Sequence, residues 1–445
     1  MMRKIIIVLY GKVFSSEGHT YGPGLRAYGL ALALKNRGHE VYIAEFFHDD
    51  DFTKHGIVFV GWNKKNLKEL LYDKDCAIFV ISSSRKIRDA VVKNYRIPLV
   101  IDLFIPTLIE LSDHFSKSSL RLTTYKRAVY NINELLLYGD YFICAGQRQR
   151  IFYLGALGSL GRLSPITYEE DMLGVIPLSS GLEPPIIPEK PLIRGKVLSE
   201  NKKIILWPGG VYPHFDAVIP IRAFVKLKKQ RSDVALVFVG SENPFGKDMF
   251  KETLNLYEQE LIASGLYGES IFTVPWIPYN QRAAMYAESD IALVTQRNTY
   301  ESLLSFRTRV VDCLWGGIPV ISNEGDEITE LLEKYGAGIS VPFDDENVLC
   351  EVLNNILDDE VKRNNMRDNA KLLYRKKFDI DKNIEPLAAF CENPQKAKDF
   401  NYPSGLKGIL IIERAFRDCI EKILLVMEGC KYIKEKGLRS FINKI

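Results

Sequence analysis

Short apolar runs alternate with segments of helical periodicity along most of the chain. The first run, at 4–9, is followed by a helical pattern at about 25–37, which Gly38 ends before the next run at 40–44. Strands that alternate with helices in this way predict parallel sheets of the α/β class. Later runs of strand length lie at 77–81, 98–103, 141–144, 204–207, 234–240 and 291–294.

Proline interrupts this alternation once. The segment 175–197 carries five prolines, a density that no regular element accepts, and the order of strand and helix restarts after it. We therefore expect two Rossmann-like, doubly wound parallel-sheet domains that face each other across a cleft. The expected division is an N-terminal domain at 1–180, a proline-rich linker at 181–200, a C-terminal domain at 201–380, and a crossover helix with a basic tail at 381–445.

One predicted helix of the second half has a polar stripe. Strands at 291–294 and 319–321 flank this helix, which we expect Ser305 to cap and Gly316 and Gly317 to end. At about 100° per residue, its polar and apolar residues separate onto two sides. The polar arc holds Ser305, Thr308, Arg309 and Asp312, and the apolar side holds Phe306, Val310, Cys313 and Leu314.

The polar arc is expected at the carboxyl edge of the C-terminal sheet, where open α/β folds bind ligands. The free amides of the helix N-terminus, with Arg307 and Arg309 beside them, suit an anion such as a diphosphate. The alternative is a solvated helix face, which accounts for most polar arcs.

Glycine-containing loops follow the first strand of each half. Gly22 and Gly24 let the backbone approach a ligand closely, and Arg26 in the following helical turn can meet a negative group. A plain connecting loop is the alternative. In the second half, Gly209 and Gly210 occupy the equivalent turn.

Composition excludes several classes of protein. The 445 residues, 47% hydrophobic and 26% charged, suffice for two globular cores. A net charge of +3, without a basic block that contains aromatic residues, argues against nucleic-acid binding. The seven cysteines show no CxxC spacing, no apolar run reaches about 18 residues, and no signal peptide is recognisable, so we expect a reduced protein in the cytoplasm.

Several segments resemble the retaining glycosyltransferases of family four, whose two Rossmann-like domains form the arrangement called GT-B. The resemblance extends to about Asn393, and its most specific piece is Asp312 followed by CLWGGIPV. The segment CAGQRQRIFYLGALGSLGR (144–162) is similar to a subgroup that builds bacterial surface polysaccharides. The other matching segments are GPGLRAYGLALALKNRGHEV (22–41), WPGGVYPHFDAVIPIRAF (207–224), YAESDIALV (286–294) and SFRTRVVDCLWGGIPV (305–320).

The resemblance implies roles for the matching residues. In the family, the acid at the position of Asp312 holds the ribose hydroxyls of the donor. The backbone near Trp276 contacts the nucleotide base, so this side chain is expected either to stack on the base or to belong to the core. The loop and helix start that hold the diphosphate are matched by Ser305, Phe306, Arg307 and Thr308.

The chain also departs from the family pattern. The first of the family's two glutamates is replaced by Leu304, with Glu301 as the nearest acid. The Arg and Lys that many members carry in the glycine turn are absent. His214 is then a candidate contact, and Arg307 or Arg309 is expected to replace the missing charge.

The histidine that many members carry after an N-terminal strand is matched by Phe104. We assign its polar role to Asp102, with Glu110 as an alternative. Asp102 ends a predicted strand, a position from which a carboxylate acts on a ligand or caps the following turn.

The resemblance implies transfer of a sugar from a nucleotide-diphosphate donor to an acceptor hydroxyl with retained anomeric configuration. Asp102, Arg309 and Glu301 are the candidate catalytic residues. Helix amides and guanidinium groups can stabilise the departing phosphate, so we expect no metal or other cofactor, and the phosphate itself can take the acceptor proton. The acidic run 49–51 superficially resembles a metal-binding motif but is expected to be a solvated charge run at a strand end.

Two other functions stay open. The departures from the family pattern also fit a non-catalytic scaffold that binds nucleotide sugars, and the fold also fits an epimerase of the GT-B type. A dinucleotide oxidoreductase is disfavoured, because no GxGxxG motif opens a strand-to-helix turn with an acid about 20 residues further on.

The C-terminal tail is amphipathic and basic. Apolar residues recur at helical spacing over 406–427, and the segment 431–445 has five basic residues and one acidic residue. Such a tail either contacts a membrane surface, as a lipid-linked acceptor at the inner face of the cytoplasmic membrane would require, or packs across the N-terminal domain. The expected partners are therefore a nucleotide sugar and a carbohydrate or lipid-linked acceptor.

Overall fold

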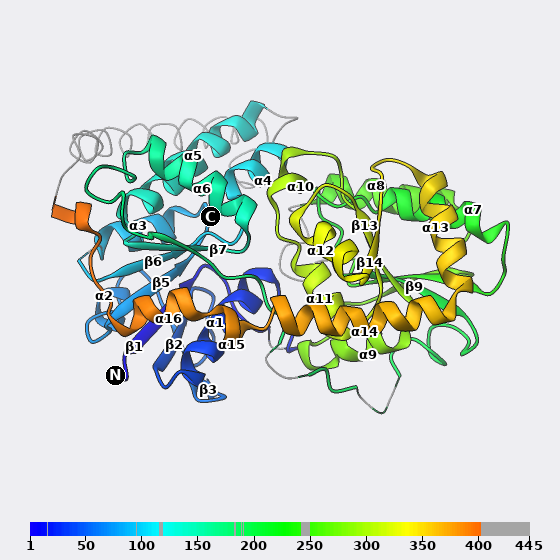
Figure 1. Ribbon diagram of the computed structural model, residues 1–445, viewed down its shortest axis with the longest axis horizontal. Helices are drawn as coiled ribbons and strands as arrows, with labels where there is room; N and C mark the ends of the chain where they lie inside the picture. Colours follow the sequence, from blue (N-terminus) through cyan, green and yellow to red (C-terminus); the bar gives the residue numbers. More distant parts are fainter. Residues whose placement is uncertain are drawn as a thin grey trace, which may run out of the picture.

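The chain forms two α/β domains that lie side by side (Figure 1). The computed structural model describes residues 1–401, except 16, 95, 115–118, 182–183, 188, 190 and 242–249. The predicted amphipathic tail at 406–445 lies outside the described residues. Within them, no helix is long and apolar enough to cross a membrane.

The N-terminal domain is built on an eight-stranded sheet in the order β3-β4-β2-β1-β5-β6-β7-β8. All neighbouring strands are parallel except β3 and β4. The strands are β1 (Lys4–Leu9), β2 (Glu40–Glu45), β3 (Phe52–Lys54), β4 (Ile57–Gly61), β5 (Cys76–Val80), β6 (Leu99–Asp102), β7 (Tyr141–Cys144) and β8 (Leu173–Val175). The helices are α1 (Gly22–Asn36), α2 (Leu67–Leu70), α3 (Arg85–Lys93), α4 (Thr107–His114), α5 (Ser119–Tyr138) and α6 (Gln147–Ser159).

The C-terminal domain has a six-stranded parallel sheet in the order β11-β10-β9-β12-β13-β14, the strand order of a Rossmann fold. Its direction of winding reverses between β9 and β12. The strands are β9 (Lys203–Pro208), β10 (Val234–Val239), β11 (Ile271–Val274), β12 (Ile291–Val294), β13 (Val320–Asn323) and β14 (Gly338–Val341). The helices are α7 (Val218–Lys228), α8 (Lys251–Ala263), η1 (Tyr279–Gln281), α9 (Arg282–Glu288), α10 (Tyr300–Leu304), α11 (Thr308–Gly316), α12 (Glu327–Tyr335), α13 (Glu346–Asp358) and α14 (Glu360–Lys377).

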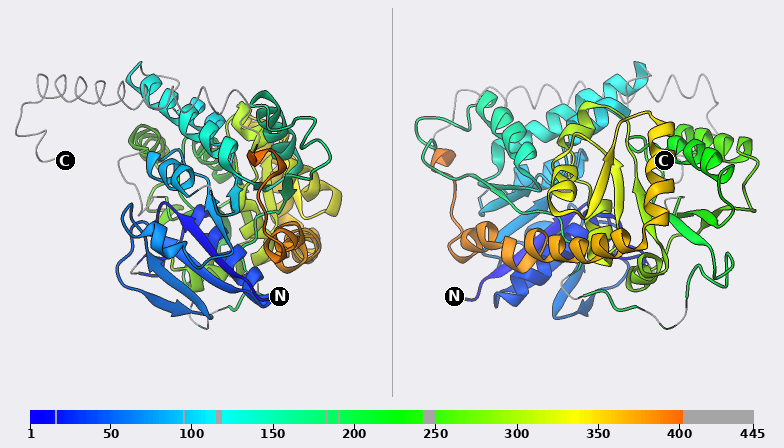
Figure 2. Two further views of the ribbon diagram at one scale, coloured as in Figure 1. Left: turned by 90° about the vertical axis from the view of Figure 1, so that its left-hand side faces the viewer. Right: turned by 45° about the vertical axis from the view of Figure 1, so that its right-hand side comes forward.

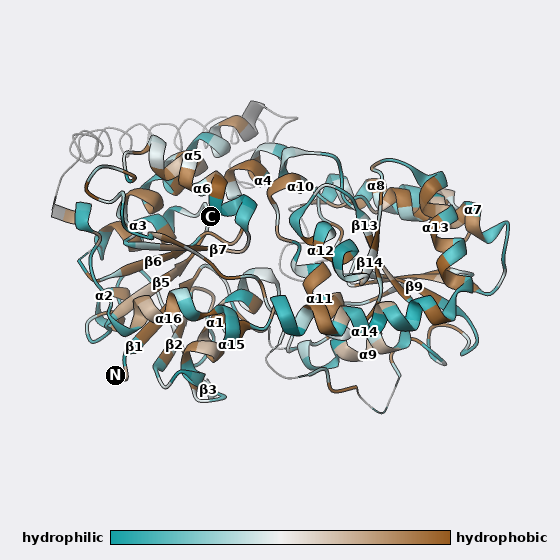
Figure 3. Cartoon of the chain, viewed as in Figure 1, coloured by the Kyte–Doolittle hydropathy of each residue, from teal (hydrophilic) through white to brown (hydrophobic). Residues whose placement is uncertain are grey.

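The predicted fold class is confirmed, because both sheets are doubly wound and all their neighbouring strands are parallel except β3 and β4. The central strands are apolar on both faces, as parallel strands covered by helices on two sides must be, and Figure 3 shows apolar strands behind helices with polar outer faces. The five cysteines in the described part of the chain are free and buried.

One predicted helix start is wrong. Ser305 does not cap the helix with the polar stripe but follows the short helix α10, whose cap is Thr299, and α11 begins at Thr308 after Arg307. The predicted end is confirmed, because Gly317 adopts a left-handed conformation with φ of 68°. The loop before α11 therefore contains the short helix α10. Its five residues are too few for hydrophobic periodicity to reveal a helix.

The chain returns to the N-terminal domain after α14. The helices α15 (Ile380–Asn383), α16 (Glu385–Glu392) and η2 (Lys398–Asn401) follow, and Figures 1 and 2 show α16 beside the first sheet. Arg37 pairs with Glu385 at 2.8 Å, and the buried guanidinium of Arg162 pairs with Asp399 at 2.6 Å. The first domain is therefore completed by residues that come after the second.

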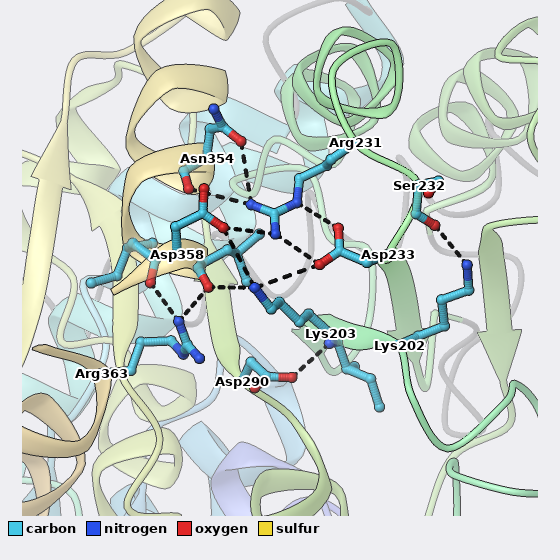
Figure 4. Close-up of polar contacts among 12 residues, drawn as sticks. Lys202, Lys203, Arg231, Ser232, Asp233, Asp290, Asn354, Asp358 and Arg363 are labelled. Carbon is cyan, nitrogen blue, oxygen red and sulfur yellow. Dashed lines mark hydrogen bonds and ion pairs between the residues drawn. The ribbon is translucent and has the colours of Figure 1, made fainter. Parts of the chain in front are cut away.

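A charge cluster ties the far edge of the C-terminal sheet together (Figure 4). Arg231 pairs with Asp233 at 2.7 Å and with Asp358 at 2.9 Å, and Lys203 lies 3.5 Å from both carboxylates. The pKa of Asp233 is lowered, with the hydrogen bond from Arg231 as the largest cause. Because Lys203 and Asp233 stand where β9 and β10 begin, the cluster lies at the edge opposite the carboxyl ends of the strands.

Candidate functional site

A cavity of about 460 Å³ opens between the two domains at the carboxyl ends of both sheets. Loops that follow β1 and β6 line it from the N-terminal domain, and loops that follow β9, β10, β11 and β12 line it from the other side. Carboxyl ends of parallel strands at a winding reversal are where open α/β sheets bind ligands. Of the predicted site residues, the cavity is lined by Gly22, Gly209, Gly210, His214, Trp276, Glu301, Ser305, Phe306, Arg307, Thr308, Arg309 and Asp312.

Arg309 is the main cation of this cavity. It stands in the first turn of α11 and donates from Nη2 to the carbonyl oxygen of Gly210. Its Nη1 is buried and has no hydrogen-bond partner, and among the described residues no carboxylate forms an ion pair with it. Burial lowers the pKa of Arg309 to about 10, so the group remains charged at neutral pH.

The turn after β9 brings backbone against this guanidinium. Gly209 has φ of 114°, a conformation that L side chains rarely adopt, and a Cβ there would lie 3.3 Å from Nη2 of Arg309. The ring of Phe215 also packs on the guanidinium, with its centroid 3.8 Å from Cζ. The group is therefore held by packing and one carbonyl rather than by a counter-ion.

A second arginine, Arg307, is neutralised by Glu301. The two groups form a buried bidentate pair with distances of 2.9 and 2.6 Å, and Ser305 also donates to the carboxylate. Burial raises the pKa of Glu301, but the charge of Arg307 and the hydrogen bonds from Arg307 and Ser305 outweigh it and lower the pKa to about 2. Glu301 therefore serves as the counter-ion of Arg307.

Asp312 is held by two residues that the sequence analysis did not single out. Arg282 donates from Nε at 2.9 Å, and the hydroxyl of Tyr286 donates to the other carboxylate oxygen. The rings of Tyr279 and Trp315 lie 3.8 and 4.2 Å from Cζ of Arg282. The spacing of Arg282 and Tyr286 on α9, one helical turn apart, is the only sequence signal that could have linked them.

On the opposite side of the cavity, Glu110 projects from the first turn of α4. Its Oε1 lies 4.0 Å from Nδ1 of His214, which stacks on Tyr212. Burial, together with the charges of Glu301 and Asp113, raises the pKa of Glu110 to about 7. Burial likewise lowers the pKa of His214 to about 4, so the imidazole is neutral near pH 7.

Trp276 forms a wall of the cavity close to the end of β10. A Cβ on Gly240, whose φ is 72°, would lie 2.9 Å from Cε3 of Trp276. The indole is only partly buried, so one part packs on the backbone and another faces the cavity. The position fits a ring that can stack on a ligand.

Three predicted site residues do not line the cavity. Asp102 is completely buried, and its two oxygens accept hydrogen bonds from Arg26 at 2.9 and 3.1 Å. Arg26 also donates to the carbonyl of Ile176, so its charge is directed into the core. Gly24 packs on the backbone of Val13, 2.9 Å from where its Cβ would stand. The catalytic role predicted for Asp102 and the phosphate contact predicted for Arg26 and Gly24 are therefore corrected, because the three residues build the first domain.

Among the described residues, no group of three or more His, Cys, Asp or Glu side chains is placed to hold a metal ion. In the acidic run at 49–51, Asp49 pairs with Lys12, and Asp51 lies 3.0 Å from Nε2 of His48. The side chains of both aspartates are largely exposed, as expected for a solvated charge run.

Comparison with known proteins agrees with this geometry. Residues 189–373 match the family model described as Glycosyl transferases group 1. No curated protein matches the chain by sequence.

Solved structures share the two-domain fold. Sucrose-phosphate synthase from Thermosynechococcus elongatus superposes with a TM-score of 0.62 at 14% identity over 87% of this chain and 96% of that chain. Anabaena HepE in complex with UDP and glucose gives 0.57 at 15% identity over 88% and 99%. The UDP-forming alpha,alpha-trehalose-phosphate synthase from Burkholderia xenovorans, in complex with glucose-6-phosphate, gives 0.59 at 12% identity over 88% and 100%. The chain therefore has the two-domain GT-B fold, and its residues 189–373 match a group 1 glycosyltransferase domain.

Proposed function

We propose that the protein transfers a sugar from a nucleoside-diphosphate donor to an acceptor hydroxyl with retention of the anomeric configuration. The observation that carries the proposal is the guanidinium of Arg309, which faces the cavity beside the glycine turn without a counter-ion. The resemblance to family four supports retention. UDP and glucose bound to a protein of the same fold support the donor class.

The charge of Arg309 accounts for what binds there. A buried charge without a partner costs several kcal/mol, and a bound anion would recover that free energy. The amides of Val310 and Val311 donate to the carbonyl of Arg307, which leaves those of Thr308 and Arg309 as donors at the positive end of the helix dipole. A diphosphate is long enough to contact both.

This arrangement also replaces the cations that family members carry in the glycine turn. Arg309 comes from α11 instead, but its Nη2 reaches the carbonyl of Gly210 in that turn. A positive charge at this point stabilises the negative charge that grows on the departing phosphate, and each such donor contributes on the order of 3 kcal/mol to lowering the barrier. We further propose that no metal ion is required.

For the acceptor, we propose a growing polysaccharide or a lipid-linked sugar of the bacterial cell envelope, with the enzyme on the cytoplasmic side of the membrane. The support is the resemblance of the segment 144–162 and the basic, apolar composition of the tail.

The test begins with thermal shifts of the purified protein against a panel of nucleoside diphosphates and nucleotide sugars. Among these ligands, one diphosphate sugar should stabilise the protein and be turned over. Arg309→Ala should then weaken its binding at least tenfold and lower kcat about 100-fold, as expected for loss of one charged donor at the transition state. Arg309→Lys should retain only part of the donor affinity and turnover, because lysine keeps the positive charge but lacks the planar guanidinium that can donate two parallel hydrogen bonds.

Arg222→Ala is the matched control, since Arg222 is a half-exposed arginine of the same domain that pairs with Glu260 outside the cavity. It should behave as the wild type. Normal donor affinity and turnover in Arg309→Ala would contradict the proposal, and loss of activity with EDTA would contradict metal independence. Donor binding without turnover under any condition would instead indicate a scaffold protein.

A further inference from the structure

Tyr212, in the glycine turn after β9, has a hydroxyl without a partner in the described part of the chain. The side chain lines the cavity, and no hydrogen bond joins its oxygen to any residue that the structure describes. The oxygen is also not sealed in the core, unlike the unpartnered hydroxyls of Thr107 and Ser180. It is therefore free to contact a ligand.

The ring of Tyr212 is held in place by packing. It stacks on the imidazole of His214, with ring centroids 5.7 Å apart and planes at 17°, and it lies at 86° to the ring of Phe250. A Cβ on Gly210 would lie 3.0 Å from the hydroxyl oxygen. The hydroxyl is thus fixed beside the turn whose carbonyl accepts from Arg309.

The hydroxyl of Tyr212 interacts with a cation of one domain and a carboxylate of the other. The charge of Arg309 lowers the pKa of Tyr212 and that of Glu110 raises it, but burial has the largest effect and raises the pKa to about 12. Tyr212 therefore keeps its proton at neutral pH and can donate a hydrogen bond. Because it interacts with both groups, it stands on the side of Arg309 that faces the N-terminal domain.

A diphosphate in this cavity needs a second donor beside Arg309. The other arginine, Arg307, is already neutralised by Glu301. A nucleotide whose base stacks on Trp276, in the same domain as Arg309, would turn the phosphate that carries the sugar toward the N-terminal domain. That is the side on which the hydroxyl of Tyr212 lies.

From this placement we propose that Tyr212 is a catalytic residue, whose hydroxyl donates a hydrogen bond to the sugar-bearing phosphate of the donor and stabilises it as it leaves. The inference rests on the proposed function and deepens it, because it adds a neutral donor to the charge of Arg309. It also makes the site selective for diphosphates, since a nucleoside monophosphate has no second phosphate within reach of Tyr212.

The hydrogen bond strengthens as negative charge grows on the departing group. The bond from the anomeric carbon to the phosphate oxygen breaks, and its electron pair stays on the diphosphate. The acceptor oxygen bonds to the same carbon on the side from which the diphosphate leaves, as retention requires, and the acceptor proton passes to the diphosphate. Tyr212 keeps its own proton throughout.

The experiment compares Tyr212→Phe with the wild type, because this change removes the hydroxyl and keeps the ring that packs on His214. Calorimetry measures the affinity for three matched pairs, which are UDP and UMP, GDP and GMP, and ADP and AMP. Turnover is followed with the nucleotide sugar that gives the largest thermal shift. Tyr212→Phe should weaken binding of the preferred diphosphate about tenfold, leave the matching monophosphate within about twofold, and lower kcat about 10- to 100-fold. The melting temperature without nucleotide should not fall, because the hydroxyl loses no partner in the described part of the protein.

Tyr300→Phe is the matched control, since Tyr300 belongs to the same domain, is 79% exposed and does not line the cavity. It should leave affinities and turnover unchanged. Equal losses of diphosphate and monophosphate affinity in Tyr212→Phe, or diphosphate affinity and kcat within about twofold of the wild type, would overturn the inference while the proposed function stands. A lower melting temperature without nucleotide would also overturn it, because the hydroxyl would then have a structural role. If none of the diphosphates binds, the proposed function fails first and the inference fails with it.

Discussion

At the scale of single residues, three carboxylates of the cavity differ in their properties because their surroundings differ. Glu301 is held ionised by a bidentate arginine, Asp312 is fixed by Arg282 and Tyr286, and Glu110 keeps a proton to near pH 7. Burial disfavours the charged form of both Glu301 and Glu110, and only Glu301 has an arginine partner that offsets this cost.

This difference predicts how stability depends on pH. The folded protein holds the proton of Glu110 to about pH 7, whereas an unfolded glutamate loses it near its ordinary value of 4.5. Stability contributed by this group is therefore present below pH 4.5 and is lost as pH rises toward 7. Glu110→Gln removes the loss, so its melting temperature should rise relative to that of the wild type between pH 5 and pH 8.

Thermal denaturation of both proteins across that range checks this prediction. Glu169→Gln, which changes an exposed glutamate outside the cavity, is the control and should follow the wild type. A difference that stays constant between pH 5 and pH 8 would show that Glu110 titrates normally.

The polar arc of α11 could be predicted from sequence because periodicity places side chains on one face of a helix. Partners that are distant in sequence could not. Asp102 ends a strand, as a catalytic acid would, but it forms a buried ion pair with Arg26, which lies 76 residues earlier in the sequence. A carboxylate at a strand end looks the same in the sequence whether it faces a cavity or the core. Glu110 lines the cavity instead, and this position is visible only in the fold.

At the scale of elements, the two domains meet through the start of α6. The carboxylate of Glu327, at the start of α12, accepts hydrogen bonds from the amides of Gln147 and Arg148 at 3.1 and 3.2 Å. Arg148 in turn donates to the carbonyls of Leu303 and Gly325. A carboxylate of one domain thus caps a helix of the other, which is favourable at a helix N-terminus.

Gly146 makes this contact possible. A Cβ there would lie 2.5 Å from Oε2 of Glu327 and 2.8 Å from Cδ2 of Phe306. Since Phe306 precedes Arg307, Gly146→Ala should displace the loop before α11 and lower donor turnover severalfold while the fold persists. Steady-state kinetics with the donor, together with circular dichroism, provide the measurement.

The control is Gly155→Ala on the same helix, because a Cβ at Gly155 meets nothing within 4 Å. It should leave turnover unchanged and stabilise α6 by roughly 0.5–1 kcal/mol. Equal kinetics for the two alanine variants would show that the start of α6 does not position the loop.

At the scale of the whole molecule, the alternation of strands and helices predicted two parallel sheets, and the structure confirms them. The helices that complete the first domain were harder to predict, because their partners lie more than 200 residues earlier. The side chain of Cys391 in α16 contacts Cys76 of β5, and Arg162 reaches Asp399. Periodicity indicates which face of a helix is apolar but not which sheet covers it.

Substitution of Leu387 tests how much the packing of α16 on the first domain contributes to the stability of the protein. Leu387 is completely buried in α16, so Leu387→Ala should destabilise the protein by about 2–5 kcal/mol, as for other core truncations of leucine. Leu372→Ala on α14, where the side chain is 37% exposed, should cost much less. Urea denaturation measures the free energy of unfolding of both variants. Similar losses in the two variants would show that the packing of α16 contributes no special stability.

The hydroxyl of Tyr374 has a consequence for motion. It donates to the carbonyl of Gly181 at 2.7 Å, and it accepts from the amides of Ser180 and Gly181 at 3.2 and 3.1 Å. Tyr374 belongs to α14, after which the chain returns to the first domain. Residues 180–181 lie in the other connection, which leads from the first domain to the second. The hydroxyl of one tyrosine therefore joins the two segments that connect the domains. A sliding of one domain past the other would have to break these hydrogen bonds.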